Sequence, residues 1–216
     1  MRRPEFIAHQ SRCPNGPFGL LLARIMAAET SRENMAALRL MNLQPTDTVL
    51  EIGCGHGRTI AQAAAKTPQG LVAGLDLSET MVQMAIRHNR RVIKEGRVEI
   101  KHGNSSSIPY PDSYFDKVFS VHTLYFWSNP IDDLREIQRV MKRDSCLVLG
   151  FKPKGEKIAA DFPSSVYTFY STDEVVRMME GAGFEQVQII ASPASTRNVL
   201  FAIAHPATTA PTHGAV

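Results

Sequence analysis

The sequence has few cysteines, a single tryptophan and no long apolar run, and these scarcities exclude several classes of protein. Its three cysteines, Cys13, Cys54 and Cys146, are odd in number and far apart, so they predict neither a disulfide framework nor a metal site. Reduced thiols of this kind are typical of the cytosol. The apolar stretch that begins at Phe18 is interrupted by Arg24, and the basic N-terminus lacks the apolar core of a secretory signal. We therefore expect a cytoplasmic protein with no membrane partner.

Strong charge of one sign is also missing. The chain has 24 basic and 21 acidic residues, which gives a formal net charge of +3. Its densest basic cluster, RHNRRVIK at 87–94, fits the solvated face of a helix better than a nucleic-acid patch, and no separate basic domain is present to hold RNA. With 216 residues, 44% of them hydrophobic, the chain is long enough for one α/β domain with its own core.

Helical patterns come first along the chain. Apolar residues recur at helical spacing over 17–29, which predicts an amphipathic helix. A second helix is expected to begin at Thr30, because Thr30 and Glu33 form a capping-box pattern, and to end before Pro45. We expect residues 1–44 to form a helical cap or lid on the rest of the chain.

Alternating strands and helices follow. Helices are expected at 58–66, after a Ser78 cap, from Asn129-Pro130 onward, and from a Ser171–Glu174 capping box to Gly183. Strands are expected at 48–52, 71–76, 97–102, 116–122, 145–151, 184–190 and 199–205.

This order of elements predicts the fold class. Regular alternation favours a doubly wound, mostly parallel seven-stranded sheet, and the last two strands, with no helix between them, favour an antiparallel C-terminal hairpin. The core should span 45–205, with 153–170 as an insertion that forms a lid and 206–216 as a disordered tail. The N-terminal helical part could instead simply cover one face of the sheet or form a homodimer contact.

A glycine-rich loop follows the first strand in VLEIGCGHGRTI. Gly53, Gly55 and Gly57 alternate with other residues, and glycine lets a ligand approach the backbone without meeting a Cβ atom. A dinucleotide fingerprint would need its third glycine at Arg58. The pattern therefore points to a ligand that contains a nucleoside but no pyrophosphate. A tight structural turn without a ligand would look similar.

Polar residues also end the next two strands. Asp76 ends GLVAGLD, where a carboxylate can accept both hydrogen bonds of a ribose diol; a plain surface or capping aspartate is the alternative. Asn104 and Ser105 follow the third strand and could bind an adenine edge, but both are also ordinary turn residues.

Several ordered motifs together resemble one family. The pieces VLEIGCGHG, GLDLSETMV, HGNSSSIPYPDSYFDKVFSVHTLYF, LREIQRVMKRDSCLVLGF and GAGFEQV are similar to those of class I S-adenosylmethionine-dependent methyltransferases, over roughly 45–205. The resemblance implies a Rossmann-like methyltransferase fold with S-adenosyl-L-methionine as cofactor.

The resemblance also implies roles for individual residues. The glycine loop of this chain would pass the methionine part of the cofactor. Glu51 would support that loop or the amino-acid part of the cofactor. The remaining cofactor contacts would be Asp76 to the ribose, Leu77 on one adenine face, Asn104 and Ser105 on the adenine edge, and His122 above the cofactor.

Candidate catalytic and acceptor-binding residues follow from position. His122 ends the fourth expected strand and is the best candidate for a general base, although it could simply bond the backbone; His9, on a segment expected to be mobile, is the weaker candidate. Aromatic residues near these positions could wall an acceptor pocket or pack in the core: Phe18, Tyr125, Trp127, Tyr167 and Tyr170.

Missing motifs narrow the acceptor. The chain has neither the Asp/Asn-Pro-Pro-aromatic motif of amino-group nucleic-acid methyltransferases nor the Pro-Cys pair of a cytosine C5 nucleophile, and His122 stands where metal-dependent enzymes carry carboxylates. We therefore expect metal-independent methyl transfer to a small molecule at oxygen, nitrogen or carbon. A protein, lipid headgroup or RNA acceptor is the alternative, as is a module that binds the cofactor without catalysis.

Overall fold

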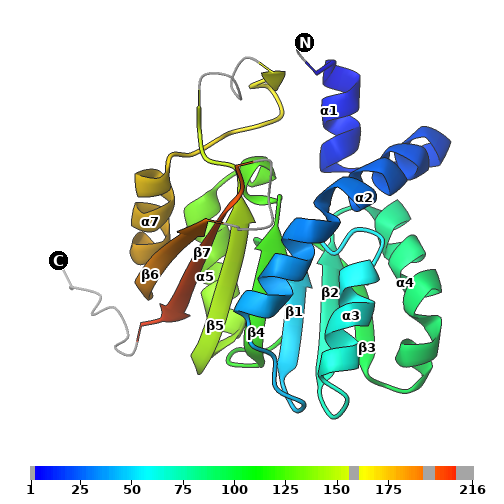
Figure 1. Cartoon of the computed structure of the whole chain (residues 1–216), viewed down its shortest axis with the longest axis vertical. Helices are drawn as coiled ribbons and strands as arrows, with labels where there is room; N and C mark the ends of the chain where they lie inside the picture. Colours follow the sequence, from blue (N-terminus) through cyan, green and yellow to red (C-terminus); the bar gives the residue numbers. More distant parts are fainter. Residues whose placement is uncertain (1–2, 156–160, 192–197, 208–216) are drawn as a thin grey trace.

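A twisted seven-stranded sheet with helices on both faces is the centre of the molecule (Figure 1). The structure is a computed structural model, and it describes residues 3–155, 161–191 and 198–207. The strand order is β3-β2-β1-β4-β5-β7-β6. This order confirms the doubly wound sheet expected from the sequence, with its switch point between β1 and β4.

The elements have the following bounds. The strands are β1 Thr48–Ile52, β2 Leu71–Asp76, β3 Val98–His102, β4 Phe115–Val121, β5 Met141–Phe151, β6 Phe184–Ala191 and β7 Leu200–Pro206. The helices are α1 Glu5–Arg12, α2 Gly16–Leu40, α3 Arg58–Lys66, α4 Glu79–Lys94, the 3₁₀ turn η1 Leu124–Phe126, α5 Pro130–Val140 and α7 Thr172–Gly181.

The first five strands pair in parallel, and β7 runs antiparallel to both β5 and β6. The antiparallel C-terminal hairpin is therefore confirmed. Since all parallel strands point the same way, their carboxyl ends meet at one edge of the sheet. In Figure 1 this is the upper edge, where α1 and the segment 161–170 also lie.

Alternation along the strands divides the core between two faces. In β1, Val49 packs with α2 and α3, whereas Leu50 and Ile52 pack on the opposite face with α5 and α7. Side chains of successive strand residues point to opposite faces, so Glu51 points to the same side as Val49. A carboxylate is thus placed under α3, close to the carboxyl edge.

The N-terminal helices differ from the sequence expectation. Residues 16–40 form one helix, α2, where a break at Thr30 was expected. The Thr30 hydroxyl donates to the carbonyl of Met26 at 3.0 Å, which is a bond made inside a continuous helix, so the capping-box expectation was wrong. Helix α1 was not expected from the sequence, and His9 belongs to this helix instead of a mobile segment.

Two other boundaries moved. Strand β5 begins at Met141, directly after α5, where Ser145 was expected, and β4 ends at Val121, which leaves His122 just beyond it. The caps at Ser78, whose hydroxyl accepts from the Met81 amide, and at Ser171 are confirmed.

At the C-terminal end, Pro206 belongs to β7, so the expected tail begins later than residue 206. Residues 208–216 of that tail and 156–160 of the expected insertion lie outside the described residues. Over the described ranges, none of the helices combines the length and the apolar character that crossing a bilayer requires.

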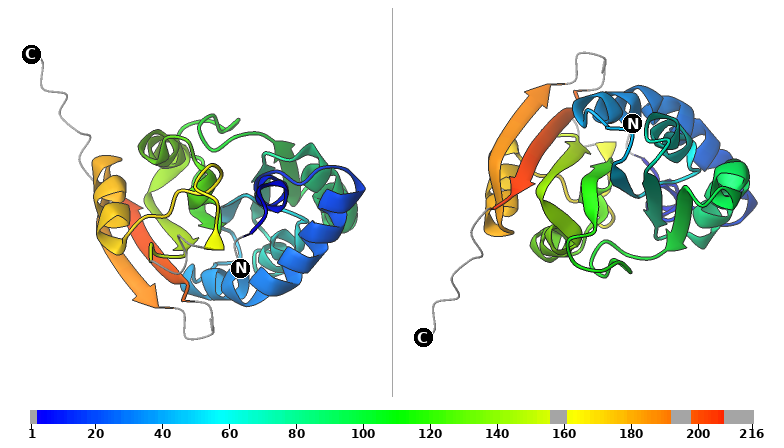
Figure 2. Two further views of the ribbon diagram at one scale, coloured as in Figure 1. Left: turned by 90° about the horizontal axis from the view of Figure 1, so that it is seen from above. Right: turned by 90° about the horizontal axis from the view of Figure 1, so that it is seen from below.

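The N-terminus and the insertion meet above the sheet. The amide of Arg3 donates to the carbonyl of Asp161 at 2.7 Å, and the Ser165 hydroxyl donates to the Glu5 carboxylate at 2.9 Å. The view from above shows both segments over the carboxyl edge of the strands (Figure 2, left). Two segments far apart in the sequence therefore cover one end of the sheet together.

Candidate functional site

A cavity of about 440 Å³ lies at the carboxyl edge of the sheet. Its floor comes from the loops after β1, β2, β3 and β4, and one side comes from the N-terminal helices. The cavity lies at the switch point of the sheet, which is where open α/β sheets bind their ligands. The cap side contributes Ser11, Arg12, Pro14, Ala23, Met26, Thr30 and Asn34.

The glycine loop is held in a conformation that other residues rarely adopt. Gly53, Gly55 and Gly57 have φ angles of 75°, 53° and 77°, all in the left-handed region. A Cβ atom at Gly53 would collide with the side chain of Thr123. At Gly55 a Cβ would meet nothing within 4 Å, so the loop is open to the cavity at that point.

Asp76 is tied to the same loop. One oxygen of its carboxylate accepts from the Gly55 amide at 2.8 Å, and the other accepts from the Ser78 amide at 2.9 Å. Burial raises the pKa of Asp76, while these two bonds from the backbone lower it. The carboxylate lines the cavity, so its remaining acceptor positions can receive donors from a ligand.

Glu51 is a buried carboxylate with an unmet hydrogen-bonding need. Its side chain is 4% exposed, and Oε2 has no hydrogen-bond partner among the described residues. Burial raises the pKa of Glu51 well above its ordinary value, and the Thr59 side chain opposes this through a hydrogen bond. A buried acceptor without a partner is costly, so a donor arriving in the cavity beside Glu51 would be bound favourably.

The loop after β3 carries Asn104 and Ser105. The Ser105 hydroxyl donates to the Asp133 carboxylate at 2.5 Å, and its oxygen lies 3.2 Å from the side-chain oxygen of Asn104. Ser105 is buried, whereas Asn104 is exposed at the cavity. Asp133 lies in the first turn of α5 and lines the same cavity. Burial raises its pKa. Of the two loop residues, Asn104 is the one presented to a ligand.

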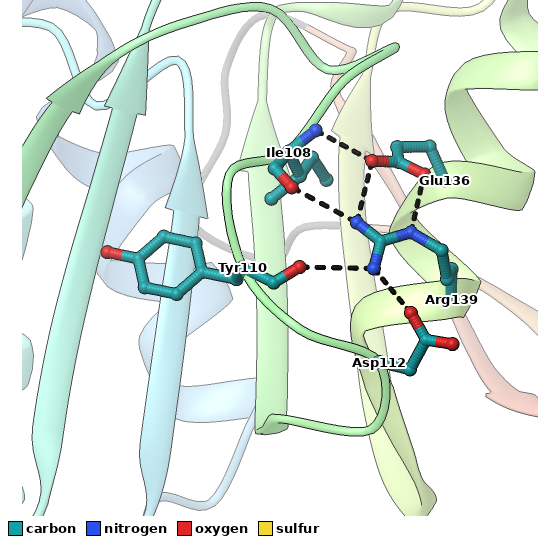
Figure 3. Close-up of polar contacts among 5 residues, drawn as sticks. All are labelled: Ile108, Tyr110, Asp112, Glu136 and Arg139. Carbon is teal, nitrogen blue, oxygen red and sulfur yellow. Dashed lines mark hydrogen bonds and ion pairs between the residues drawn. The ribbon is translucent and has the colours of Figure 1, made fainter.

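Arg139 fastens this loop to α5 (Figure 3). Its guanidinium donates to the carbonyls of Ile108 and Tyr110, each at 3.0 Å, and pairs with Glu136 and Asp112. Glu136 in turn accepts from the Ile108 amide at 2.7 Å. Since bidentate arginine–carboxylate pairs fix geometry, the network holds in place the chain that follows Asn104 and Ser105.

His122 lies directly after β4 with a φ angle of 64°, unusual for a residue other than glycine. Its amide donates to the carbonyl of Gly150 at 2.9 Å, which fixes the backbone in this conformation. Its ring Nδ1 is hydrogen-bonded to the Tyr125 hydroxyl. His122 lines the larger cavity and also a smaller one beside it.

The smaller cavity has a volume of about 80 Å³. Four residues, Met26, Thr30, His122 and Phe126, line both cavities, so the two adjoin. The rest of the smaller cavity is formed by Arg3, Glu29, Tyr125, Lys152, Phe162, Tyr167 and Phe169.

The structure brings together most of the residues that the sequence nominated. The larger cavity is lined by Glu51, Gly53, Gly55, Asp76, Leu77, Asn104, Ser105, His122 and Trp127, and the smaller one by His122, Tyr125 and Tyr167. Gly57, the last glycine of the loop, is the N-cap of α3 and is not part of the described lining of either cavity.

Three nominated residues are placed elsewhere. Phe18 is 42% exposed and packs on Phe6 with ring centroids 5.0 Å apart. His9 is exposed on α1, and Tyr170 packs against the edge of the core. None of the three is part of the described lining of either cavity.

Other lining residues were missed. His56 lies within the glycine loop, and burial, together with nearby Arg58 and His88, lowers its pKa to about 4. Asp132 and Asp133 occupy the first turn of α5, where acidic residues ordinarily complement the helix dipole. The loop around Pro14 reaches the cavity because its carbonyl accepts from the buried Ser78 hydroxyl at 2.5 Å. Only the His56 position, inside the glycine motif, carried a signal in the sequence.

Comparisons with known proteins agree with this geometry. A family model described as a methyltransferase domain matches residues 50–149. A demethylmenaquinone methyltransferase of Bacillus cereus is 30% identical over an alignment of 184 residues that covers 70% of this chain and 76% of the relative. The uncharacterized methyltransferase YdaC of Bacillus subtilis is 25% identical over 170 residues, covering 79% of this chain and 89% of that protein.

A solved structure is similar as well. The crystal structure of an S-adenosylmethionine-dependent methyltransferase from Aquifex aeolicus superposes with a TM-score of 0.65 at 27% identity, over 79% of this chain and 88% of the other.

Proposed function

The chain belongs to the class I S-adenosylmethionine-dependent methyltransferases, and from that premise we propose that it methylates a small molecule without the help of a metal. The observation that carries the proposal is the position of His122, which lines both the larger cavity and the aromatic smaller one. A cofactor in the first and an acceptor in the second would meet at this side chain.

The larger cavity fits the cofactor by its donors and acceptors. Glu51 offers a buried carboxylate oxygen without a partner, which suits the ammonium of the methionine part. Asp76 offers a carboxylate to the ribose diol, and the open backbone at Gly55 leaves room beside it. Leu77, 42% exposed, and Asn104 would contact the adenine, while Ser105 holds the loop through Asp133.

When bound, S-adenosylmethionine supplies a methyl group already activated by a sulfonium centre, so the main task of the protein is to place the acceptor in line. Positioning of this kind contributes up to about 7–11 kcal/mol in ideal cases. The covering segments, α1 and 161–170, would exclude water from the acceptor site. They are joined by the hydrogen bond from the Ser165 hydroxyl to the Glu5 carboxylate of α1.

His122 would take the proton that a hydroxyl or ammonium acceptor loses. This role requires the tautomer in which Nδ1–H donates to the Tyr125 oxygen, because the lone pair then lies on Nε2. The bond between the His122 amide and Gly150 fixes the ring relative to the sheet. Tyr125 would act as a positioning residue that selects the tautomer.

The acceptor is proposed to be small because the second cavity is. Its volume of about 80 Å³ is far below the roughly 300–1,000 Å³ of sites for drug-sized ligands. A relative that is 30% identical acts, by its name, on demethylmenaquinone, which also favours a small molecule over a macromolecule.

Two measurements test the proposal. Calorimetric titration with S-adenosylmethionine and S-adenosylhomocysteine should show micromolar binding of both. Formation of S-adenosylhomocysteine should then depend on an added small hydroxyl or amine compound and persist after treatment with a chelator. Binding without turnover on any acceptor would favour a non-catalytic module, and turnover only on protein, lipid or RNA would refute the small-molecule acceptor.

A further inference from the structure

The smaller cavity has walls of stacked and edge-on aromatic rings. Tyr167 and Phe169 are stacked with an interplanar angle of 4° and centroids 5.8 Å apart, and Phe162 meets Tyr167 edge-on at 4.9 Å. Tyr125 contacts Phe169 directly, with ring centroids 4.9 Å apart, so the four rings form one continuous aromatic wall. Rings arranged in this way favour a flat, conjugated occupant, because offset and edge-to-face contacts add to simple burial.

Two cations lie near one ring of this aromatic cavity. The Arg3 guanidinium is 4.8 Å from the centroid of Phe162, and the Lys152 ammonium is 5.7 Å from the same ring. Arg3 also donates to the hydroxyls of Ser11 at 3.1 Å and Tyr167 at 3.2 Å. Because hydroxyls carry no charge, these bonds orient the guanidinium without neutralising it.

The balance of charge in the cavity is positive. Among the described residues of its lining, Arg3 and Lys152 are cationic and Glu29 is anionic. Arginine presents a planar fork that matches a carboxylate, and charge-assisted bonds of this type are the stronger ones. The cavity is therefore suited to a planar molecule that bears a single acidic group.

The residues that line the smaller cavity differ in whether they also line the larger one. His122 lines both cavities, whereas Arg3 and Lys152 line only the smaller one. An acidic group bound by Arg3 would consequently point away from the larger cavity, and the opposite end of the same ring would face His122. This arrangement presents a nucleophile on the ring, and not the acid itself, to the methyl donor.

From these observations we infer that the acceptor is a small aromatic carboxylic acid, held through its carboxylate by Arg3 with Lys152, and methylated at a hydroxyl or amine on the far side of its ring. The inference rests on the proposed function, since it assigns the substrate class of that site. Arg3 would be the residue that determines specificity.

The test compares matched probes on the full chain saturated with S-adenosylhomocysteine. Calorimetry would measure the binding of 3- and 4-hydroxybenzoate and 3- and 4-aminobenzoate, of the corresponding uncharged benzamides, and of hydroxybenzylamines. We expect at least one acid to bind about 10- to 100-fold more tightly than its amide, the range expected for charge-assisted hydrogen bonds. In a separate assay with S-adenosylmethionine, the product of turnover should be an ether or an N-methyl compound.

Variants separate recognition from folding. Arg3→Gln should abolish most of the preference for acid over amide while leaving the affinity for the amide unchanged, and Arg3→Lys should restore part of it. Arg32→Gln, an exposed arginine on α2, is the matched control and should keep the full preference. Lys152→Gln should lower the preference independently, so the result does not depend on one variant.

The outcomes are distinguishable from failure of the proposed function. If S-adenosylhomocysteine does not bind at all, the proposed function fails first. If it binds, but no acid is preferred over its amide, or amines are preferred, or Arg3→Gln weakens acid and amide equally, the assignment of an acidic acceptor is wrong. A methyl ester as product would also overturn it, because the acid would then face the methyl donor.

Discussion

His122 and Tyr125 share a hydrogen bond between ring Nδ1 and the phenolic hydroxyl, where His122 lines both cavities and Tyr125 lines the smaller one. Tyr125 is buried, and this burial, followed by the nearby Tyr167, raises its pKa. The phenol therefore stays neutral over the working pH range. It can orient the imidazole without competing for its proton.

Replacing His122 should slow turnover without loosening the cofactor. Asparagine is the preferred substitution, because it tolerates the left-handed backbone at this position better than alanine. We expect His122→Asn to lower kcat about 10²–10⁴-fold, the usual range for a general base, with little change in the Kd for S-adenosylhomocysteine. Tyr125→Phe should lower kcat less and shift the pH profile of kcat. Wild-type turnover of His122→Asn across the pH range would remove His122 as the base.

Asp76 should be required for cofactor affinity. Asp76→Ala removes the acceptor for the ribose diol and also the partner of the Gly55 amide, so the Kd for S-adenosylhomocysteine should rise at least 10-fold, as expected for loss of a charged hydrogen bond. Glu79→Gln, an exposed carboxylate on α4, serves as the control. A 2′-deoxyribose analogue should bind both Asp76→Ala and wild type about equally weakly. Unchanged affinity of Asp76→Ala for the ribose form would refute the assignment.

Glu51 should stabilise the complex at the expense of the free protein. Since the pKa of Glu51 is raised by burial in the folded state, the ionised carboxylate destabilises the fold as the pH rises above the unfolded value of about 4.3. Glu51→Gln should therefore raise the Tm of the free protein near neutral pH, by about 2–4 °C per kcal/mol, and the gain should vanish near pH 4. A lower Tm at neutral pH would contradict this reasoning.

The same substitution should weaken cofactor binding. An ammonium beside Glu51 favours its ionised form, so affinity for S-adenosylhomocysteine should increase as the pH rises through the raised pKa of Glu51. Glu51→Gln should lower the affinity and remove this component of the pH dependence. Glu180→Gln, exposed on α7, should do neither, and calorimetry over a series of pH values would distinguish the three proteins.

Arg139 should control the order of the loop after β3. Arg139→Met breaks the bonds to two carbonyls and to Glu136 shown in Figure 3, and we expect a loss of about 1–3 kcal/mol in the free energy of unfolding. Affinity for S-adenosylhomocysteine should also fall, because the loop carries Asn104. Arg135→Met, on the exposed side of the same helix, is the control. Equal effects of the two substitutions would show that Arg139 has no special role.

The central sheet could be predicted from the sequence because its signals are local. Short buried strands such as 48–52, the Ser78 and Ser171 caps, and a glycine at Gly183 with φ 93° each follow from a few adjacent residues. The positions of Glu51 and Asp76 at strand ends follow from the same boundaries. Local signals therefore predict the part of the site that lies at the ends of the parallel strands.

The N-terminal region could not be predicted in the same way. The Thr30–Glu33 pattern looks like a capping box, but nothing before it breaks the helix, and Glu33 is 2% exposed within a continuous α2. Helix α1 is short, and its only fully buried alanine, Ala8, packs into the main core. Contacts such as the one between Arg3 and Asp161 join residues far apart in the chain, and no local pattern announces them.

The acceptor side shows the same limit. Tyr167 and Tyr170 were nominated together because both are aromatic, yet Tyr167 lines the smaller cavity and Tyr170 does not. Their segment has no regular period, so its sequence does not say which ring turns inward. That choice depends on packing against Tyr125 and Phe126 from another part of the fold.

The smaller cavity is built largely from chain outside the span that the family model matches. The matched domain covers 50–149, whereas the lining from either side of it consists of Arg3, Met26, Glu29, Thr30, Lys152, Phe162, Tyr167 and Phe169. Substitutions in these flanks can change the preferred molecule while the βα units that surround the larger cavity stay intact. Related enzymes are thus expected to differ in sequence first in these flanks. A new acceptor specificity can then evolve while the cofactor-binding site is unchanged.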